Sequence, residues 1–372
     1  MSAPVEVWEM DIPRSRLTNQ RIAAPEPGGP ADVVRWMGAT QAQDAAQAAW
    51  AVGLRSAGAT VGDVERAIAD REIVRTWPMR GTLHLVPAGD ARWMVGLSEA
   101  RMIASTRRRR EQLGLDDATM TRCLRLFASA LSGGGPMPRS RMLRLLADAG
   151  VDPGGQRGYH VLWYAAQVGL ICQGPREGAE DTFALLDEWG PGGETLSREV
   201  ALATLAGRYV ASHGPATVHD FAWWAGLTVG DARLGLDGAQ GMLTSVPSGG
   251  KSYWVAGGPP VPELGRAGLP EVYLLPGFDE YLLGYRDRDA VLNPAHARRV
   301  VPGANGVFFP TVIVDGQVAG TWKRRFTGGA VEITVSPFGN LDALGDLIDG
   351  AARSFGAFLG LPLAGSGVTI VE

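Results

Sequence analysis

The sequence predicts an α+β protein in which three small helical modules, each ending in a pair of strands, precede a β-rich C-terminal domain. Three observations lead to this prediction. Two stretches of the chain repeat one plan: a helix, a Gly-Pro turn, two more helices and a strand pair. The first hundred residues also end in a hairpin pattern, and strand-like runs dominate after residue 258. Helices followed by a hairpin are the plan of a winged helix-turn-helix.

Length and composition describe an ordinary globular protein. The 372 residues can form several modules with ample core, at 45% hydrophobic and 20% charged residues. No apolar run approaches the ~20 residues of a membrane span. The N-terminus carries acid and lacks a basic-then-apolar signal pattern. We therefore expect a cytoplasmic protein without a membrane segment.

The protein is not basic overall, but the charge pattern is compatible with a local basic face. The net charge of -4 argues against nucleic-acid binding over the entire surface. Only Lys251 and Lys323 are lysines, so 35 minus 2 leaves 33 arginines. Arginine suits phosphate contacts, although a GC-rich genome produces the same excess. The shortage of lysine disfavours Schiff-base chemistry, which needs a buried amine.

Cysteine and histidine indicate no metal centre. Cys123 and Cys172 lie in unrelated contexts without metal-ligand spacing, and the five histidines are scattered. A disulfide framework, a structural zinc site and a cofactor are all unexpected.

The first module, residues 1–100, contains predicted helices at 16–22, 31–37 and 61–69, and an Ala-rich helix that ends near residue 55. Residues 73–87 form two β-favouring runs broken near residues 78–81, which predicts a hairpin.

A glutamine pair, Gln41 and Gln43, stands before the Ala-rich helix. It follows Gly38, a residue that suits the C-terminus of the preceding predicted helix. Within a helix, residues two apart are rotated by roughly 200° and cannot serve one point. On extended backbone they share a face and can aim two amide carbonyls at one water. The alternative is a capping or loop role for Gln41 and a solvated first-turn position for Gln43.

The second and third modules, residues 101–190 and 191–258, carry the repeat. Their predicted helices are 119–131, 139–149, 158–169, 197–210, 217–225 and 228–237, and their strand pairs are 170–173 with 182–186 and 242–246 with 252–256. Four consecutive arginines, residues 107–110, lie near the start of the second module and form either a phosphate contact or a solvated face.

The C-terminal domain, residues 259–372, follows a Gly- and Pro-rich linker and is predicted to be barrel-like. Predicted strands are 272–275, 281–285, 307–314, 317–322 and 331–335, and a closing helix covers 341–361. An Asp-Gly turn at 315–316 indicates a hairpin. Neighbouring strand residues face opposite ways, so Asp279 and Glu280 should not act on one atom, and Asp279 is interpreted as structural.

Three motifs, residues 79–87, 274–288 and 306–322, resemble the bacterial AlkZ/YcaQ family of winged-helix DNA glycosylases, which act on bulky or cross-linking alkylation damage. The resemblance covers nearly the whole chain. It implies three tandem winged helices plus a C-terminal β-domain, forming a concave surface for duplex DNA. The family motif is Gln-x-Gln in the AlkZ-like branch and Gln-x-Asp in the YcaQ-like branch. Gln41 and Gln43 match the AlkZ-like branch, whose members protect producers of DNA-alkylating compounds or serve as housekeeping relatives.

The resemblance implies hydrolysis of the N-glycosidic bond of N7-alkylguanine or N3-alkyladenine in double-stranded DNA. Such a base is cationic and leaves readily, so two oriented amide dipoles that hold a water at C1′ suffice. We expect a monomeric, cofactor-free glycosylase without lyase activity.

Basic and polar residues near turns are the predicted DNA contacts. They are Arg80 in the first hairpin, Arg286 and Arg288, then His296, Arg298, Arg299 and Asn305 in a hairpin over 296–309, and finally Lys323, Arg324 and Arg325. The competing functions are a winged-helix transcription regulator and a non-catalytic damage-binding protein. Regulators of this kind usually dimerise, and no dimerisation heptad is visible.

Overall fold

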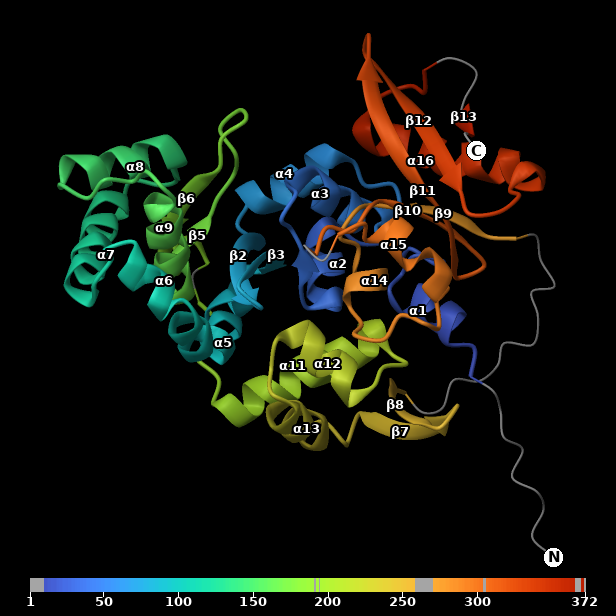
Figure 1. Ribbon diagram of the computed structural model, residues 1–372, viewed down its shortest axis with the longest axis horizontal. Helices are drawn as coiled ribbons and strands as arrows, with labels where there is room; N and C mark the ends of the chain where they lie inside the picture. Colours follow the sequence, from blue (N-terminus) through green and yellow to red (C-terminus); the bar gives the residue numbers. More distant parts are fainter. Residues whose placement is uncertain are drawn as a thin grey trace, which may run out of the picture. The chain divides into compact units, whose positions relative to one another are not determined.

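The computed structural model describes residues 10–190, 192–193, 195–257, 270–303, 306–364 and 369–370 (Figure 1). These residues form a mixed α+β chain that divides into two compact units. The six-stranded unit comprises Gly28–Gly53 and Ala59–Ala201. The five-stranded unit comprises Met1–Pro27, Leu54–Gly58 and Leu202–Glu372.

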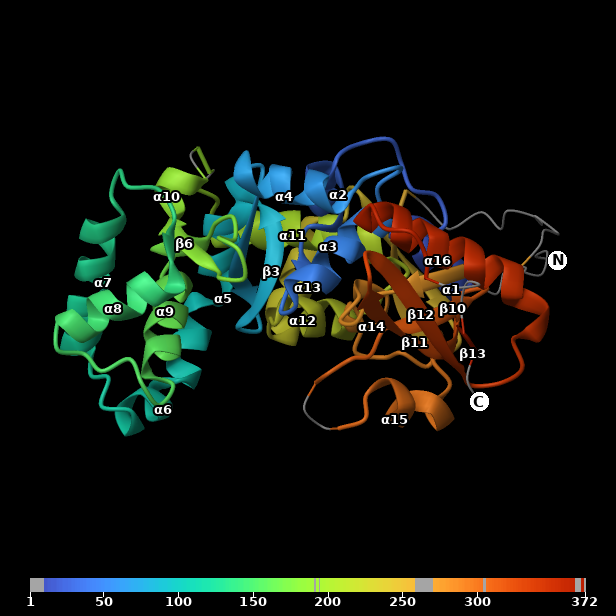
Figure 2. The same ribbon diagram turned by 90° about the horizontal axis from the view of Figure 1, so that it is seen from above.

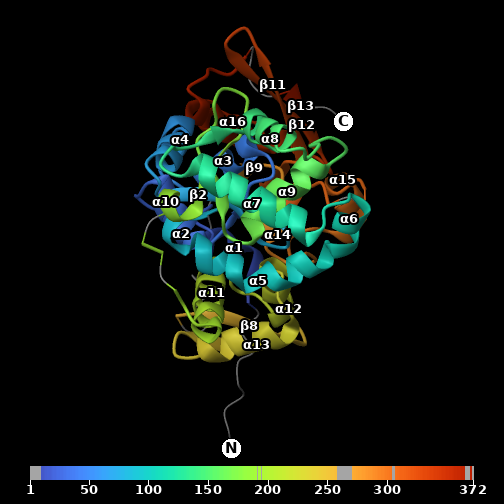
Figure 3. The same cartoon turned by 90° about the vertical axis from the view of Figure 1, so that its left-hand side faces the viewer.

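The six-stranded unit is built on one antiparallel sheet with helices around it. The strand order is β1 (Thr40–Gln41), β3 (Thr82–Pro87), β2 (Ile73–Met79), β5 (Ile171–Gln173), β6 (Thr182–Leu185) and β4 (Met137–Pro138). Its helical segments are α2 (Pro30–Met37), α3 (Ala45–Leu54), α4 (Val61–Ala69), η1 (Ala88–Asp90), α5 (Ala91–Ser105), α6 (Arg107–Gln112), α7 (Asp117–Leu131), α8 (Arg139–Asp148), α9 (Arg157–Gln167) and α10 (Leu186–Trp189). Helices α7, α8 and α9 pack together at one end of this unit (Figures 1 and 3).

Local signals in the sequence fix several of these boundaries. Gly38 ends α2 with a φ of 76°, a conformation that glycine adopts without strain. Thr60 and Asp63 form a capping box, and α4 covers the predicted residues 61–69. The predicted 73–87 hairpin is confirmed as β2 and β3.

The hairpins of the first two predicted modules share one sheet. Arg75 on β2 pairs with Gln173 on β5, so the two strand pairs are joined. Trp77 on β2 packs in the same core as Phe127, Met142 and Trp163 of the following helices. The two stretches therefore fold around a common core.

The five-stranded unit holds a second sheet, in the order β13 (Thr369–Ile370), β12 (Ala330–Pro337), β11 (Gln317–Thr327), β10 (Thr311–Val314) and β9 (Val272–Leu275). Its other elements are α1 (Ile12–Asn19), most of α11 (Arg198–His213), α12 (Val218–Ala225), α13 (Val229–Gly238), the hairpin β7 (Leu243–Ser248) and β8 (Lys251–Ala256), α14 (Glu280–Leu283), η2 (Pro294–His296), α15 (Ala297–Val300), η3 (Asp342–Leu344) and α16 (Gly345–Leu359). Helix α16 lies along the sheet, where Phe355 meets Trp322 edge-on at 5.2 Å (Figure 2).

The barrel-like prediction for this domain is wrong as to closure. In the described residues β9 and β13 are the two edges of the sheet and do not pair with each other. The Asp315-Gly316 hairpin is confirmed, with β10 paired to β11.

Two further predictions in this unit, the strand over 281–285 and the hairpin over 296–309, are wrong because helices begin in or near these segments. Residues 281–285 are no strand: α14 begins at Glu280, because the Asp279 carboxylate accepts from the N–H of Tyr281 at 2.8 Å. The segment 296–309 is no β-hairpin in its described part. The Asn293 side chain and Pro294 begin η2, which α15 continues. The loop returns where Phe309 N–H donates to Val300 O at 2.9 Å.

The described residues hold neither a membrane-spanning helix nor a cluster of metal-binding side chains. None of the described helices is long and apolar enough to cross a bilayer. No group of three His, Cys, Asp or Glu side chains in that part of the chain could hold a metal ion. Cys123 and Cys172 are free and buried, and burial raises the pKa of Cys172 to about 12.

A buried ion pair holds the five-stranded unit together. The Arg55 guanidinium donates to both oxygens of Asp279, at 2.7 and 2.8 Å, and to Gln20 Oε1 at 2.8 Å. Only 1% of the Arg55 side chain and 2% of the Asp279 side chain are exposed. The pair joins the 54–58 segment to α14 and to the residue after α1. Asp279 thus has the structural contacts that the sequence indicated, although on a helix cap rather than a strand.

We predict that Asp279→Ala lowers the free energy of unfolding by about 3–5 kcal/mol, because it leaves the buried Arg55 charge uncompensated. Urea unfolding measures the change. The control is Arg325→Ala, which removes an exposed 2.8 Å pair with Glu332 in the same unit and should cost less than about 1 kcal/mol. Equal losses in the two variants would contradict the prediction.

Candidate functional site

The glutamine pair precedes α3 on non-helical backbone. Gln41 is the last residue of β1 and pairs with His84 on β3, and Ala42 N–H donates to Leu83 O at 2.7 Å. Gln43 lies in a bend, and helix α3 starts only at Ala45. Both glutamines thus precede the helix, one on a strand and the other in a bend.

Asp44, rather than a glutamine, caps α3. Its Oδ1 accepts from the N–H groups of Ala46 and Gln47, at 2.9 and 3.1 Å. The alternative, with Gln41 as a cap and Gln43 in the first turn, is therefore not what the structure shows.

The two glutamine amide oxygens are bonded to the β2–β3 hairpin, one at its turn and the other on β3. Gln41 Oε1 accepts from Arg80 Nη2 at 3.1 Å, and Gln43 Oε1 accepts from the N–H of Leu83 at 3.3 Å. Gln41 is 8% exposed, whereas Gln43 is exposed. Each carbonyl oxygen has a second lone pair, which can accept a hydrogen bond from water. The arrangement can thus present two uncharged acceptors near one turn.

The turn itself is tightly constrained. Arg80 has a φ of 52° and Gly81 a φ of 66°, so a non-glycine residue sits in the left-handed region at the tip. Trp163 Nε1 donates to Gly81 O at 3.3 Å. Arg80, a predicted DNA contact, is only partly exposed and contacts Gln41.

His84 is a buried neighbour of Gln41 that sequence reasoning did not single out. It is fully buried, and its Nδ1 lies 2.9 Å from Thr82 O. A carbonyl oxygen only accepts, so Nδ1 carries a proton. The sequence placed His84 in the β-favouring run over residues 73–87, and the structure shows that this part of the run, β3, pairs with β1.

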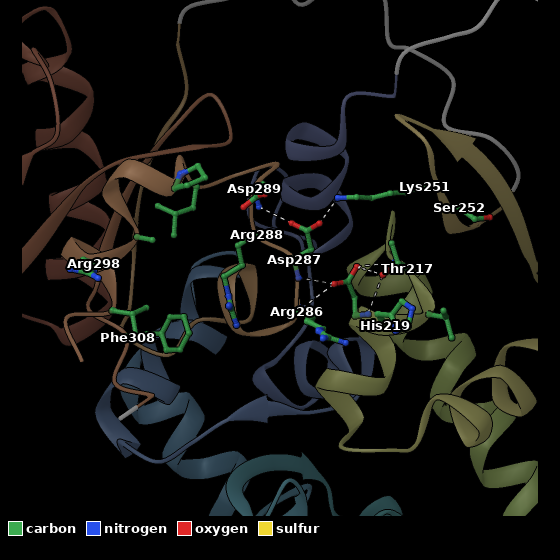
Figure 4. A pocket seen from close by; sticks show the side chains of 16 residues that line it. Thr217, His219, Lys251, Ser252, Arg286, Asp287, Arg288, Asp289, Arg298 and Phe308 are labelled. Carbon is green, nitrogen blue, oxygen red and sulfur yellow. Dashed lines mark hydrogen bonds and ion pairs between the residues drawn. The ribbon is translucent and has the colours of Figure 1, made fainter. Parts of the chain in front are cut away.

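Three predicted DNA contacts line a single cleft in the five-stranded unit. Arg286, Arg288 and Arg298 line a cavity of 1110 Å³, with Arg298 at the left and Arg286 near the middle of the view in Figure 4. Arg286 and Arg298 are exposed, and within the described part of the chain neither guanidinium has a protein partner. His219 and Lys251, which the sequence did not single out, line the same cleft.

The cleft walls are joined by acidic side chains. Asp220 in α12 accepts from the backbone N–H groups of Arg286 and Asp287, at 3.0 and 3.1 Å, and Lys251 on β8 is ion-paired with Asp287 (Figure 4). Among the described residues, the lining thus carries four basic side chains, Lys251, Arg286, Arg288 and Arg298, against three carboxylates, Asp220, Asp287 and Asp289.

Arg288 differs from its neighbours because its guanidinium is used inside the protein. Its Nε donates to Leu282 O at 2.7 Å, and the group lies 5.0 Å from the centre of the Phe308 ring. The sequence could not separate this arginine from Arg286 or Arg298.

The remaining predicted contacts lie elsewhere in the five-stranded unit. His296 and Arg299 both pack on Phe338, and Arg299 donates to Pro337 O at 2.9 Å. On β11, Lys323 is exposed, Arg324 lies over Phe355 at 5.8 Å, and Arg325 pairs with Glu332 at 2.8 Å. Asn305 lies outside the described residues.

Comparisons with known proteins agree on one family. A family description, "DNA glycosylase AlkZ-like", matches residues 34–358. A curated protein of Streptomyces sahachiroi, an interstrand DNA cross-link repair glycosylase, is 29% identical over 333 residues, which cover 84% of this chain and 86% of that protein. The solved structure of the Streptomyces sahachiroi DNA glycosylase AlkZ has a TM-score of 0.80 at 27% identity, covering 97% of this chain and 98% of that one.

We predict that Arg288→Ala lowers the free energy of unfolding by about 1–3 kcal/mol, because Leu282 O loses its donor. Arg298→Ala, at the same cleft, should stay within about 0.5 kcal/mol of the wild type, since its side chain is exposed. Urea unfolding compares the two. A larger loss in Arg298→Ala than in Arg288→Ala would show that the contacts of Arg288 are not structural.

Proposed function

The chain belongs to the AlkZ-like family of DNA glycosylases, and from this premise we propose that it excises bulky N7-alkylguanine and N3-alkyladenine adducts from duplex DNA. The observation that carries the proposal is the position of Gln41 and Gln43. Both residues precede α3 on non-helical backbone, where Gln41 Oε1 accepts from Arg80 and Gln43 Oε1 accepts from the N–H of Leu83. This placement on one hairpin supports their proposed role as two acceptors for one water.

The proposed reaction is a hydrolysis. The glycosidic C1′–N bond breaks and its electron pair stays on the cationic base, which leaves neutral. Water forms the new C1′–O bond and loses a proton to solvent, and the product is an abasic site. The amide oxygens of Gln41 and Gln43 accept hydrogen bonds from the water and turn the negative ends of their dipoles toward the oxocarbenium ion.

Neutral acceptors match this substrate. An alkylated cationic purine needs little further activation, so two dipoles worth about 10²–10³-fold each can suffice. An amide is a weak base, and an undamaged nucleotide, with its poorer leaving group, should be spared. With only two lysines in the sequence, we propose water as the nucleophile and no lyase activity.

The proposal includes cross-linked substrates, the oligomeric state and the cellular role. The curated relative is named for the repair of interstrand DNA cross-links, and we propose that cross-linked purines are among the substrates here. We further propose a monomeric cytoplasmic enzyme that serves alkylation repair or self-resistance.

The module plan is part of the same proposal. Residues 1–100, 101–190 and 191–258 are each proposed to act as a winged helix on DNA, with residues 259–372 as the β-rich domain. The concave DNA surface that the resemblance implies stays a prediction.

Phosphate contacts are proposed at the cleft in the five-stranded unit. Arg286 and Arg298 are exposed arginines that line the cleft, and arginine suits bidentate contact with phosphate. Lys323 is a further exposed candidate. Arg80, Arg299, Arg324 and Arg325 would have to exchange protein contacts for phosphate.

We predict that Gln41→Ala and Gln43→Ala each lower the single-turnover rate of excision by about 10²–10³-fold, because each removes an acceptor for the attacking water. The measurement is abasic-site formation on a duplex carrying one N7-alkylguanine. Gln240→Ala, in which the lost side chain bonds Asp237, is the control and should excise normally. Normal excision by both glutamine variants would place the reaction elsewhere. DNA binding without excision by the wild type would favour a regulator or damage sensor.

We predict that Arg286→Ala combined with Arg298→Ala flattens the salt dependence of DNA binding. Each lost phosphate contact should lower the slope of log K against log salt by about 0.9, so the pair should lower it by about 1.8. Fluorescence anisotropy with undamaged duplex measures the slope. A control of equal charge, Arg35→Ala with Arg66→Ala, removes arginines paired with Asp32 and Asp63 and should leave it unchanged. Equal slopes for the two double variants would remove the cleft from the DNA contacts.

A further inference from the structure

A buried arginine holds the main chain of the glutamine pair. Arg75 Nε donates to Ala42 O at 2.8 Å, and its Nη2 donates to Gln43 O at 3.4 Å. Arg75 is 8% exposed. The guanidinium therefore contacts the carbonyls of two consecutive residues, one of which is the second glutamine.

The position of Arg75 in the sheet explains how its side chain contacts the glutamine segment. Arg75 lies on β2, and β3 separates β2 from β1. Across β3, Arg75 pairs with Leu85, which pairs in turn with Thr40. The three residues share a face, so a long side chain on β2 can cross β3 and meet the segment that leaves β1.

The segment needs this contact because its own strand is short. Strand β1 has only 2 residues, and α3 does not begin until Ala45. On the β3 side, Ala42 N–H and the Gln43 side chain are bonded to Leu83. Arg75 binds the carbonyls of the same two residues, so it sets the peptide planes from which the Gln43 side chain projects.

Asp181 holds the guanidinium in place. Arg75 Nη1 lies 3.0 Å from Asp181 Oδ1, and Asp181 directly precedes β6. Burial lowers the pKa of Arg75, and the Asp181 carboxylate opposes that shift. Arginine stays protonated in proteins, and a buried charge without its partner is costly. Asp181 Oδ1 also lies 3.3 Å from Arg176 Nε, and Arg176 donates to Ala179 O rather than to the glutamine segment.

We propose that Arg75 and Asp181 are positioning residues for the Gln41–Gln43 pair. Asp181 fixes the guanidinium, and the guanidinium fixes the carbonyls of Ala42 and Gln43. The proposal rests on the proposed function of the glutamines. It makes the chemistry of residues in the first predicted module depend on a carboxylate in the second.

A merely stabilising pair would behave differently from a positioning pair. Arg75→Lys keeps the charge but cannot reach two carbonyls and a carboxylate from one planar group. Asp181→Asn keeps the size but removes the charge, whereas Asp181→Glu keeps the charge. Arg176→Ala is the matched control, since it removes the other ion pair of Asp181 and leaves the contacts of Arg75 in place.

The first test is single-turnover excision of N7-alkylguanine together with the Kd for undamaged duplex. We expect Arg75→Lys and Asp181→Asn to lose about 10–10²-fold in rate, as for a small misplacement of reacting groups, with the Kd changed less than about threefold. Asp181→Glu should be faster than Asp181→Asn, and Arg176→Ala should stay near the wild type. Wild-type rates in Arg75→Lys and Asp181→Asn, or an equal loss in Arg176→Ala, would overturn the proposal.

The second test needs no excision, so it separates this proposal from the proposed function. With ¹⁵N-glutamine labelling, the side-chain amide signals of Gln41 and Gln43 report their orientation. We expect them to shift or broaden in Arg75→Lys and to stay unchanged in Arg176→Ala, in protein that still unfolds cooperatively. Unchanged signals in Arg75→Lys would overturn the proposal even if the wild type proved inactive on alkylated DNA.

Discussion

Antiparallel pairing of Gln41 with His84 is the contact on which the candidate site depends, because it keeps the chain extended between two helices. Gly38 ends the first helix and Asp44 caps the second, which leaves only a short segment between them. Such a segment has little structure of its own. Its geometry is imposed by β3 on one side and by the Arg75 side chain on the other. The site is therefore as rigid as the sheet that borders it.

Charge at this site is arranged around neutral acceptors. A guanidinium close to an oxocarbenium ion would oppose its formation, since like charges repel most strongly where water is excluded. The positive charge of Arg75 is offset by Asp181, whereas the Arg80 guanidinium donates directly to Gln41 Oε1. The groups proposed to face the water are uncharged amides. The arginines proposed to bind phosphate at the open cleft, Arg286 and Arg298, belong to the other compact unit.

Local sequence signals predicted most of the elements and the place of the glutamine pair. The Thr60–Asp63 capping box and the β-favouring run over 73–87 are short-range patterns, and both were confirmed. The strand predicted over residues 281–285 was wrong because a short apolar run fits a strand or a buried helix equally well. The predicted barrel was wrong because closure depends on which edge strands pair, and no residue pattern indicates that pairing.

Contacts distant in sequence were beyond such reasoning. Arg75 and Asp181 are 106 residues apart, and nothing in their spacing links them. Arg288 and Arg298 look alike in the sequence, yet one guanidinium is bonded to a backbone carbonyl and the other is exposed. Which arginines are structural is decided by packing, and packing requires the fold.

The two buried cysteines have a consequence for a protein that meets electrophiles. The thiolate is the reactive form of cysteine. Burial raises the pKa of Cys123 and takes that of Cys172 to about 12, so at neutral pH both sulfurs remain protonated and shielded. Neither cysteine therefore offers an exposed thiolate to an electrophile. If the chain acts on alkylated DNA as proposed, its thiols are kept from reacting with the alkylating compound.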